Sequence, residues 1–184
     1  MSVLLKGEGL ALVRGGRLLF ENLGIRLESG EALHVTGANG SGKSSLIRLV
    51  AGLLRPLAGR IERSAAALAD EGLALDRELP LERALAFWNG PRLKEAIGAF
   101  ELDELRHVPV RLLSTGQAKR ARLARVAASG APLWLLDEPL NGLDQKGFDE
   151  LGRALEAHRE SGGAVLAASH VALPGRWGTL SLSS

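Results

Sequence analysis

The stretch that decides the fold is Gly37-Ala38-Asn39-Gly40-Ser41-Gly42-Lys43-Ser44. It matches the P-loop pattern G-x-x-x-x-G-K-[ST] in full, and it lies between an expected strand, 32–35, and an expected helix, 45–54. The glycines let the backbone wrap so that successive N–H groups point inward at a phosphate chain, and the helix adds the positive end of its dipole. The alternative interpretation is an ordinary glycine turn before a helix, but such a turn would not need all the residues of the P-loop pattern.

The P-loop residues predict a site for a nucleoside triphosphate and its metal ion. Lys43 would reach the β- and γ-phosphates as a point charge and act in catalysis, and the Ser44 hydroxyl would ligate Mg²⁺. The expected cofactors are therefore a nucleoside triphosphate and Mg²⁺. The residues expected to contact the nucleotide here are Gly37, Ala38, Asn39, Gly40, Ser41, Gly42, Lys43, Ser44 and Ser45.

Two adjacent acids, Asp137 and Glu138, follow the apolar run 133–136, which predicts a buried strand. Ligands of open α/β sheets bind outside the carboxyl ends of the strands, which is also where a P-loop lies. Asp137 would hold Mg²⁺ through water, and Glu138 would orient or deprotonate the attacking water. A strand that ends in two acids is a weak signal alone, and it gains its meaning from the P-loop.

Strands alternate with helices along the rest of the chain. Residues 1–36 contain short apolar runs separated by glycine turns, which predicts strands and hairpins. Further strands are expected at 60–63, 65–69 and 164–169, and helices at 81–88, 92–100, 118–129 and 146–161. The predicted fold is α/β, a P-loop NTPase core with a mainly parallel sheet, an N-terminal antiparallel β region and a short helical subdomain. We expect one domain over 1–184, with the helical subdomain at about 70–125.

The composition narrows the function classes. The chain has 184 residues and no cysteine, which excludes disulfide scaffolds, thiol nucleophiles and cysteine-based metal sites. The formal net charge of +2 gives no reason to expect a nucleic-acid partner. No apolar run approaches the roughly 20 residues that span a bilayer, so another chain would have to hold this one at a membrane.

Five motifs in a fixed order point to a family. The P-loop is followed by the pentapeptide 113–117 (LSTGQ), the Asp137-Glu138 strand end, the turn 141–144 (NGLD) and a histidine after a later strand, His170. This order resembles the ATP-binding subunits of ABC transporters. The resemblance implies that Ser114, Gly116 and Gln117 contact the ATP held by the P-loop of a second subunit, so that a head-to-tail homodimer binds two nucleotides.

The same resemblance assigns two further residues. Asp144 matches the aspartate that communicates between the two nucleotide sites, although the preceding Asn141-Gly142 departs from the usual pair of small residues. His170 matches the switch histidine that hydrogen-bonds the γ-phosphate and takes part in catalysis. The other histidines, His34, His107 and His158, have no such placement, and we expect them to be structural.

Two departures from the family pattern concern the nucleotide site. The family's glutamine loop would lie near 70–75, but this segment has no glutamine, and Glu71 is the nearest candidate to replace it. The N-terminal aromatic that stacks on adenine is also missing, and Arg14 could stack through its guanidinium plane instead. If neither replacement residue performs the role of the missing one, slow turnover or relaxed selectivity for the nucleotide base would follow.

One branch of the family resembles nearly the whole chain. Stretches such as 18–23, 49–53 and 131–139 are similar to the ATPase subunits of the bacterial cytochrome c-biogenesis, or haem exporter, complex. This resemblance implies an ATP-hydrolysing translocase subunit on the cytoplasmic side of the inner membrane, bound to a transmembrane permease. The alternatives are an ABC ATPase for another cargo, such as a drug or a lipid, and a nucleotide-gated assembly factor with little turnover. A chromosome-organising ATPase would need a long coiled coil that this chain lacks.

Some side chains have plainer expected roles. Lys119, Arg120, Arg122 and Arg125 are expected on a solvated helix face or a dimer interface, and Trp88, Trp134 and Trp177 in core or interface packing. Phe87 and Trp88 are candidates for a groove that receives a helix of the membrane subunit.

Overall fold

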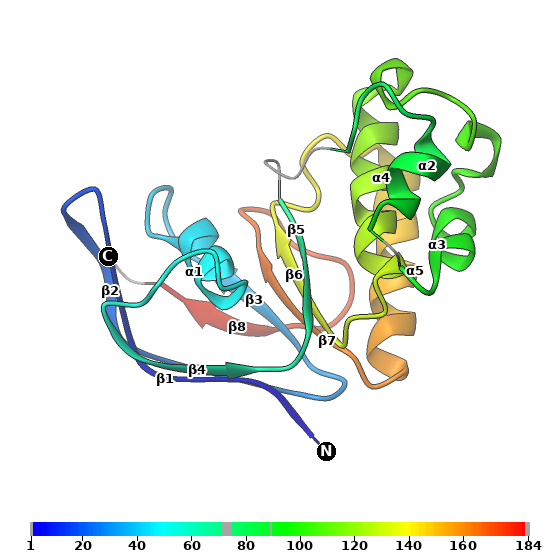
Figure 1. Cartoon of the computed structure of the whole chain (residues 1–184). Helices are drawn as coiled ribbons and strands as arrows, with labels where there is room; N and C mark the ends of the chain where they lie inside the picture. Colours follow the sequence, from blue (N-terminus) through cyan, green and yellow to red (C-terminus); the bar gives the residue numbers. More distant parts are fainter. Residues whose placement is uncertain (1, 71–74, 89, 183–184) are drawn as a thin grey trace.

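The computed structural model describes residues 2–70, 75–88 and 90–182. Figure 1 shows an antiparallel sheet, a parallel sheet and a group of helices on the far side of the parallel sheet. The strands are β1 (Val3–Arg14), β2 (Arg17–Glu28), β3 (Ala32–Thr36), β4 (Ala58–Arg63), β5 (Ala66–Ala69), β6 (Leu133–Asp137), β7 (Ala164–Ala168) and β8 (Gly178–Ser181). The helices are α1 (Lys43–Val50), α2 (Leu81–Ala86), α3 (Leu93–Ala99), α4 (Thr115–Ala128) and α5 (Gln145–Glu160), with short 3₁₀ turns at Asp103–Leu105 and Val110–Leu112.

The antiparallel sheet has the order β2-β1-β4. Its strands β1 and β2 are each twelve residues long, where the sequence predicts several short runs. The strands continue past their glycines because the pairing is irregular at these positions. For example, the β1–β4 register shifts between Glu8 and Ala11, where Gly9 has φ +59°. Across from this bulge Gly59 has φ +90°, and a Cβ there would lie 2.5 Å from the carbonyl oxygens of Glu8 and Gly9.

The parallel sheet has the order β5-β6-β7-β3-β8, and every neighbouring pair in it is parallel. All five residues of β6 and all five of β7 are buried, as expected for strands covered on both faces. The P-loop follows β3, Glu138 follows β6, and Ser169 and His170 follow β7. Because the three strands are parallel neighbours, these three segments meet at one edge of the sheet.

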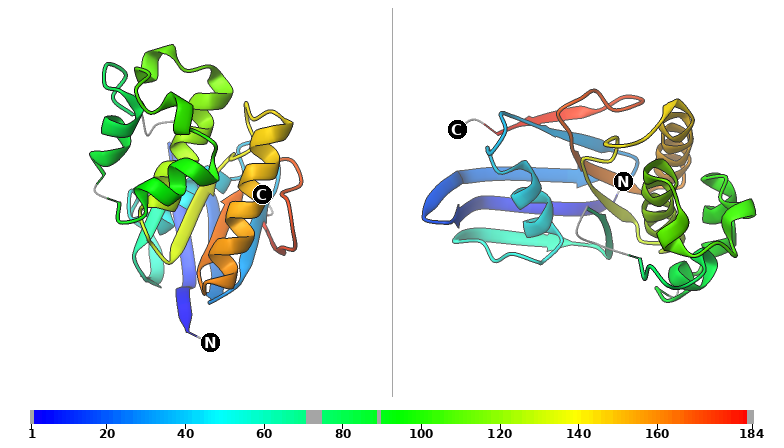
Figure 2. Two further views of the ribbon diagram at one scale, coloured as in Figure 1. Left: turned by 90° about the vertical axis from the view of Figure 1, so that its right-hand side faces the viewer. Right: turned by 90° about the horizontal axis from the view of Figure 1, so that it is seen from above.

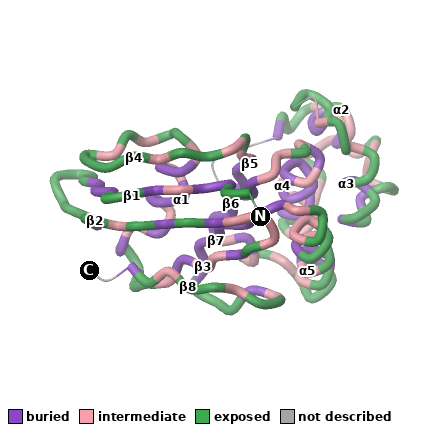
Figure 3. Tube along the Cα trace, turned by 90° about the horizontal axis from the view of Figure 1, so that it is seen from below, coloured by how far each residue is buried: buried purple, intermediate pink, exposed green. Residues whose placement is uncertain are grey.

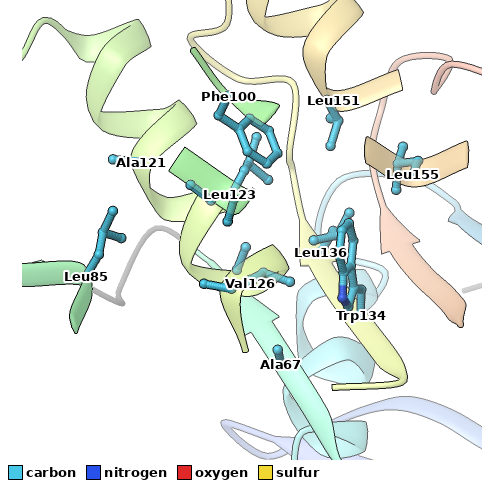
Figure 4. Packing of buried hydrophobic residues seen from close by; sticks show 14 of the residues in the cluster. Ala67, Leu85, Phe100, Ala121, Leu123, Val126, Trp134, Leu136, Leu151 and Leu155 are labelled. Atoms are coloured by element: carbon cyan, nitrogen blue, oxygen red, sulfur yellow. The ribbon is translucent and has the colours of Figure 1, made fainter. Parts of the chain in front are cut away.

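Two hydrophobic cores lie on the two faces of the parallel sheet. One contains α1 and the inner side chains of β1 and β2, and the other contains residues of α2 to α5. Figure 2 shows α1 between the antiparallel strands and the parallel sheet, with α4 and α5 on the opposite side. Figure 4 shows Phe100, Leu123, Leu136, Leu151 and Leu155 in the second core. In Figure 3 the buried positions follow the central strands and the inner sides of α4 and α5.

The element boundaries differ from the expected ones in instructive places. Helix α1 begins at Lys43, inside the P-loop pattern, and α4 begins at Thr115, so the pentapeptide forms the start of its helix. Strand β8 was not predicted, since its pattern GTLS has few apolar residues and it pairs at the sheet edge beside β3. No helix in the described part of the chain is long and apolar enough to cross a membrane.

The prediction for the basic run on α4 is wrong for three of its four residues. Lys119, Arg120 and Arg125 are buried, with exposed fractions of 5%, 8% and 7%. Each finds an acceptor inside the chain: Lys119 the carbonyl of Glu138, Arg120 the Glu150 carboxylate, and Arg125 the carbonyl of Leu68. Only Arg122 is partly exposed. The cations face inward because the helix packs against polar groups of the sheet edge and α5.

The tryptophans divide between two environments. Trp134 is buried and stacks on His158 at a centroid distance of 4.0 Å, as expected for core packing. Trp177 is partly buried and packs against the second core. Trp88 is 43% exposed, and the Arg125 guanidinium lies 4.6 Å from its ring centroid.

Candidate active site

The P-loop connects the carboxyl end of β3 to α1 and takes a backbone path that depends on glycine. Gly37, Gly40 and Gly42 have φ values of +146°, +79° and +101°. A Cβ on Gly37 would lie 2.7 Å from both the Leu182 carbonyl oxygen and Ser41 Oγ. Other side chains cannot adopt this path without strain.

The loop presents unused hydrogen-bond donors. Among the described residues, no acceptor receives the main-chain N–H groups of Lys43, Ser44 and Ser45 at the start of α1, and the helix has no side-chain cap. Ser41 Oγ is buried without a partner in the same part of the structure. Such an uncapped helix start binds anions, so the loop fits a phosphate chain. The Lys43 ammonium bends back over the loop and donates to the carbonyls of Gly37 (2.8 Å) and Ala38 (3.1 Å).

The two predicted metal ligands lie together. Ser44 Oγ donates to Asp137 Oδ1 at 2.8 Å, although the two residues are 93 positions apart in the chain. Burial raises the pKa of Asp137, and the Ser44 hydrogen bond and the Arg48 charge oppose that rise. One hydroxyl and one carboxylate are a partial ligand set of the kind that Mg²⁺ uses when phosphates supply the rest, so these residues fit the ion.

Glu138 and His170 form a second pair at the same edge. His170 Nδ1 lies 2.8 Å from Glu138 Oε2, and the ring donates because the carboxylate accepts. The Glu138 main chain has φ +47°, a conformation that few non-glycine residues adopt, and its N–H donates to the Ala168 carbonyl at 2.8 Å. The strand end therefore turns sharply and brings the Glu138 side chain to the P-loop.

The P-loop and Glu138 border one pocket of about 430 Å³. It is lined by Arg14, Leu19, Asn39, Gly40, Gly42, Lys43, Ser44, Ser45 and Glu138. Arg14 Nη1 donates to Ser45 Oγ at 3.3 Å. Arg14, which stands in the segment where the adenine-stacking aromatic is expected, therefore reaches the start of α1 at the P-loop.

The pentapeptide lies outside this pocket, since none of its residues lines it. Ser114 caps α4: its Oγ accepts from Gln117 N at 3.2 Å, and Gln117 Oε1 accepts from Ser114 N at 2.9 Å. Ser114 and Thr115 are exposed, so this helix start is open to another molecule. Asp144 caps α5 by accepting from Gly147 N at 2.8 Å.

The remaining predictions for histidines and the glutamine loop have mixed outcomes. His34 donates to the Ser169 carbonyl at 2.9 Å and His158 stacks on Trp134, both structural contacts, while His107 is exposed. Burial lowers the pKa of His158 to about 4. Glu71 lies outside the described residues. Its neighbour Asp70 is buried and pairs with Arg48 of α1 at 3.3 Å.

Sequence reasoning did not identify the contact of Lys119 with the main chain of Glu138 at the candidate site. Its Nζ donates to the main-chain carbonyl of Glu138 at 2.8 Å. The one available signal is helical spacing, because Lys119 stands four residues before the buried Leu123 and therefore on the same face of α4.

Comparisons with known proteins agree with this geometry. A family model described as "ABC transporter" matches residues 20–141. The structure described as the "ATP binding subunit of ABC transporter" superposes with a TM-score of 0.81 at 24% identity, over 91% of this chain and 80% of that one. An ATP-binding protein of an ABC transporter from Pyrococcus furiosus superposes with a TM-score of 0.84 at 20% identity, over 98% of both chains. At these identities the superpositions show the fold alone. The family match defines an ATP-hydrolysing subunit of the ABC class, and the fold agrees with it.

Sequence relatives narrow the class. The chain is 56% identical over 180 residues to the "Cytochrome c biogenesis ATP-binding export protein CcmA" of Sphingopyxis alaskensis, covering 94% of this chain and 93% of that protein. It is 60% identical over 163 residues to the protein of the same name from Novosphingobium aromaticivorans, covering 88% and 85%. The chain belongs to the family of cytochrome c biogenesis ATP-binding export proteins within the ABC transporters.

Proposed function

We propose that the chain binds ATP and Mg²⁺ in the pocket at the P-loop and hydrolyses the nucleotide with Glu138 as the base. The observation that carries the proposal is the 2.8 Å hydrogen bond from Ser44 to Asp137, because it joins the two expected metal ligands beside the unused donors of the P-loop. The bound ion would neutralise charge on the phosphates. Every other task falls to side chains that line or border the pocket.

Each side chain has a defined task in this proposal. Lys43 leaves the carbonyls of Gly37 and Ala38 and pairs with the β- and γ-phosphates. Glu138 accepts the proton of the attacking water, and His170 orients the Glu138 carboxylate through its Nδ1 hydrogen. Arg14, which lines the same pocket and donates to Ser45, would hold the base of the nucleotide.

The test is the variant Glu138→Gln. Loss of the general base lowers kcat by about 10²–10⁴-fold, while binding of ATP persists because the P-loop is unchanged. ATP-bound dimers should accumulate in size-exclusion chromatography with Mg²⁺. The matched control is Glu104→Gln, which changes an exposed acid on a 3₁₀ turn and should keep wild-type turnover. A Glu138→Gln variant that hydrolyses ATP normally and stays monomeric contradicts the proposal.

The position of the pentapeptide supports the proposal of a dimer. Ser114, Gly116 and Gln117 do not line the pocket of their own chain, and Ser114 is exposed at the start of α4. A second copy in head-to-tail orientation would place this helix start against the γ-phosphate in the first copy's pocket, where its N–H groups and dipole favour an anion. Asp144, at the start of α5, would lie near the same junction.

The partner at the membrane would be a transmembrane permease subunit that contacts Phe87 and Trp88. Phe87 is 78% exposed at the end of α2, an unusual position for a large aromatic side chain. Phe87→Ala should weaken co-purification with the permease and leave ATP binding unchanged. Leu57→Ala, which removes an apolar side chain that is 69% exposed beside β4, is the control. Equal co-purification of both variants would refute this contact.

The proposed cargo of the complex is haem, and the proposed location of this chain is the cytoplasmic side of the inner membrane. The support is the name shared by the relatives, which describes export in cytochrome c biogenesis. Steady-state ATPase assays with and without the permease distinguish a pump from an assembly factor with little turnover. If haem stimulates ATP turnover in the complex, the result supports haem as the cargo. If another class of compound stimulates turnover and haem does not, that class replaces haem as the proposed cargo.

A further inference from the structure

Lys119 joins the start of α4 to the main chain of Glu138. It stands in the second turn of the helix, two residues after Gln117, and its exposed fraction is 5%. Its Nζ donates to the Glu138 carbonyl oxygen at 2.8 Å. An ammonium hydrogen bond is charge-assisted, and the buried position strengthens it because water competes little.

The Glu138 backbone needs such a restraint. Its φ of +47° is in the left-handed region, and a side chain held there depends on its surroundings to keep the conformation. Three main-chain contacts hold the turn: Glu138 N–H to the Ala168 carbonyl at 2.8 Å, Asn141 N–H to the Glu138 carbonyl at 3.2 Å, and the Lys119 bond. Among the described residues, only the Lys119 contact comes from a helix outside the sheet edge.

The helix connects this contact to an exposed surface. Ser114 and Lys119 are five residues apart, which corresponds to about 7.5 Å along a helix axis. A helix moves as a rigid unit over this distance. Any displacement of the exposed start of α4 therefore moves Lys119 Nζ relative to the Glu138 carbonyl.

We propose that Lys119 is a positioning residue that sets the direction of the Glu138 carboxylate and couples it to the position of the α4 start. The inference rests on the proposed function, because it takes Glu138 as the base and the α4 start as the contact for the second subunit's nucleotide. Hydrolysis in one pocket then depends on the nucleotide in the other pocket through one lysine, with no change in the P-loop.

The first experiment compares Lys119→Met, which keeps the length and removes the donor, with Lys119→Gln, which retains a donor on a shorter side chain. Lys119→Met should lower kcat by about 10–100-fold with an unchanged KM for ATP, because a misplaced base affects the chemical step and not nucleotide binding. Lys119→Gln should recover part of kcat. Arg122→Met, three residues further along α4 and partly exposed, is the matched control and should keep wild-type kcat.

The second experiment separates positioning from a purely structural role. In the Glu138→Gln background, Lys119→Met should form the same ATP-bound dimer with the same ATP affinity, since only the direction of residue 138 depends on Lys119. A dimer lost in this background means that Lys119 holds the whole helix in place, and overturns the inference. Wild-type kcat in Lys119→Met, or equal loss in Lys119→Met and Lys119→Gln, overturns it as well.

The two proposals fail in different ways. Normal turnover in Glu138→Gln refutes the proposed function whatever Lys119 does. An inactive Glu138→Gln together with an active, folded Lys119→Met refutes the role of Lys119 alone. Should Lys119→Met not fold, Lys119→Gln decides: a lower kcat at unchanged KM supports positioning, and a higher KM at unchanged kcat overturns it.

Discussion

The buried ion pair between α4 and α5 offers a quantitative test of how the helices are held together. Arg120 Nη1 donates to Glu150 Oε1 at 3.1 Å and to the Phe100 carbonyl at 3.1 Å. The Glu150 side chain has an exposed fraction of 0% and that of Arg120 9%. Replacing one partner leaves the other charge buried without compensation.

The magnitude follows from that burial. Arg120→Met should lower the free energy of unfolding by about 3–5 kcal/mol, as is typical when one partner of a buried pair is removed. Domains of this size gain or lose about 2–4 °C in Tm per kcal/mol, so a fall of roughly 10 °C is expected. The double variant Arg120→Met/Glu150→Leu should recover to within about 1–2 kcal/mol of wild type, because no charge remains and only the Phe100 carbonyl loses its donor.

The pH dependence gives a second, independent signature. Burial raises the pKa of Glu150 above its usual 4.5, and Arg120 opposes this rise. Above the folded-state pKa the carboxylate is charged, and the free-energy cost of burying that charge is fully present. As the pH falls through that pKa toward 4.5, the folded chain takes up a proton before the unfolded chain does, and this cost is relieved. Arg120→Met raises the pKa of Glu150 further. Its deficit in stability should therefore be largest at pH 7.5 and smaller at pH 5.

The assay is urea unfolding followed by circular dichroism and by tryptophan fluorescence, to which the buried Trp134 contributes, at pH 7.5 and pH 5. Wild type, both single variants and the double variant complete a double-mutant cycle. Two results would refute the reasoning: a deficit for Arg120→Met that is the same at both pH values, or a double variant whose deficit equals the sum of the single ones.

Three further changes test other contacts. The pKa of His158 is lowered to about 4, against 6.5 in the unfolded chain, so the free energy of unfolding should fall by about 2 kcal/mol, after solvent screening is allowed for, as the pH drops from 6.5 toward 4. In His158→Gln, urea unfolding at the two ends of this pH range should no longer show that fall. An unchanged fall would mean that other titrating groups cause it. Arg14→Ala should raise the KM for ATP about two- to fivefold at constant kcat, with Arg17→Ala as the exposed control, and an unaltered KM would remove Arg14 from the nucleotide pocket. Gly59→Ala should cost about 2 kcal/mol in urea unfolding because of its positive φ and its approach to the β1 bulge, whereas Gly15→Ala, in the open β1–β2 turn, should cost less.

The parts of the site that are local in sequence could be predicted. The P-loop depends on glycines at fixed positions and on a strand and helix that adjoin it, so its pattern alone indicates its shape. Asp137 and Glu138 could be placed at a sheet edge because four consecutive apolar residues, 133–136, precede them. The cap formed by Ser114 and Gln117 is also local, although the start of α4 was expected three residues later.

Other features depended on how the elements pack. The basic residues of α4 have the spacing of a charged, solvated face, and only the packing of that helix against Glu150 and the Glu138 carbonyl buries them. A helical period shows which residues share a face, but it does not show which acceptors the neighbouring elements provide. The contact of Arg14 with Ser45 likewise depends on packing, and the replacement of the adenine aromatic by Arg14 stays a prediction.

By itself, the sequence determined that this chain has a phosphate loop, two acids at a strand end, a pentapeptide before a helix and a histidine after a later strand, because each depends on a short run of residues. Only the tertiary structure decided how they meet. The order β6-β7-β3 places Ser44 at 2.8 Å from Asp137 and His170 at 2.8 Å from Glu138. Strand order is set by long-range pairing and by burial of both sheet faces, and no local pattern of residues encodes that choice.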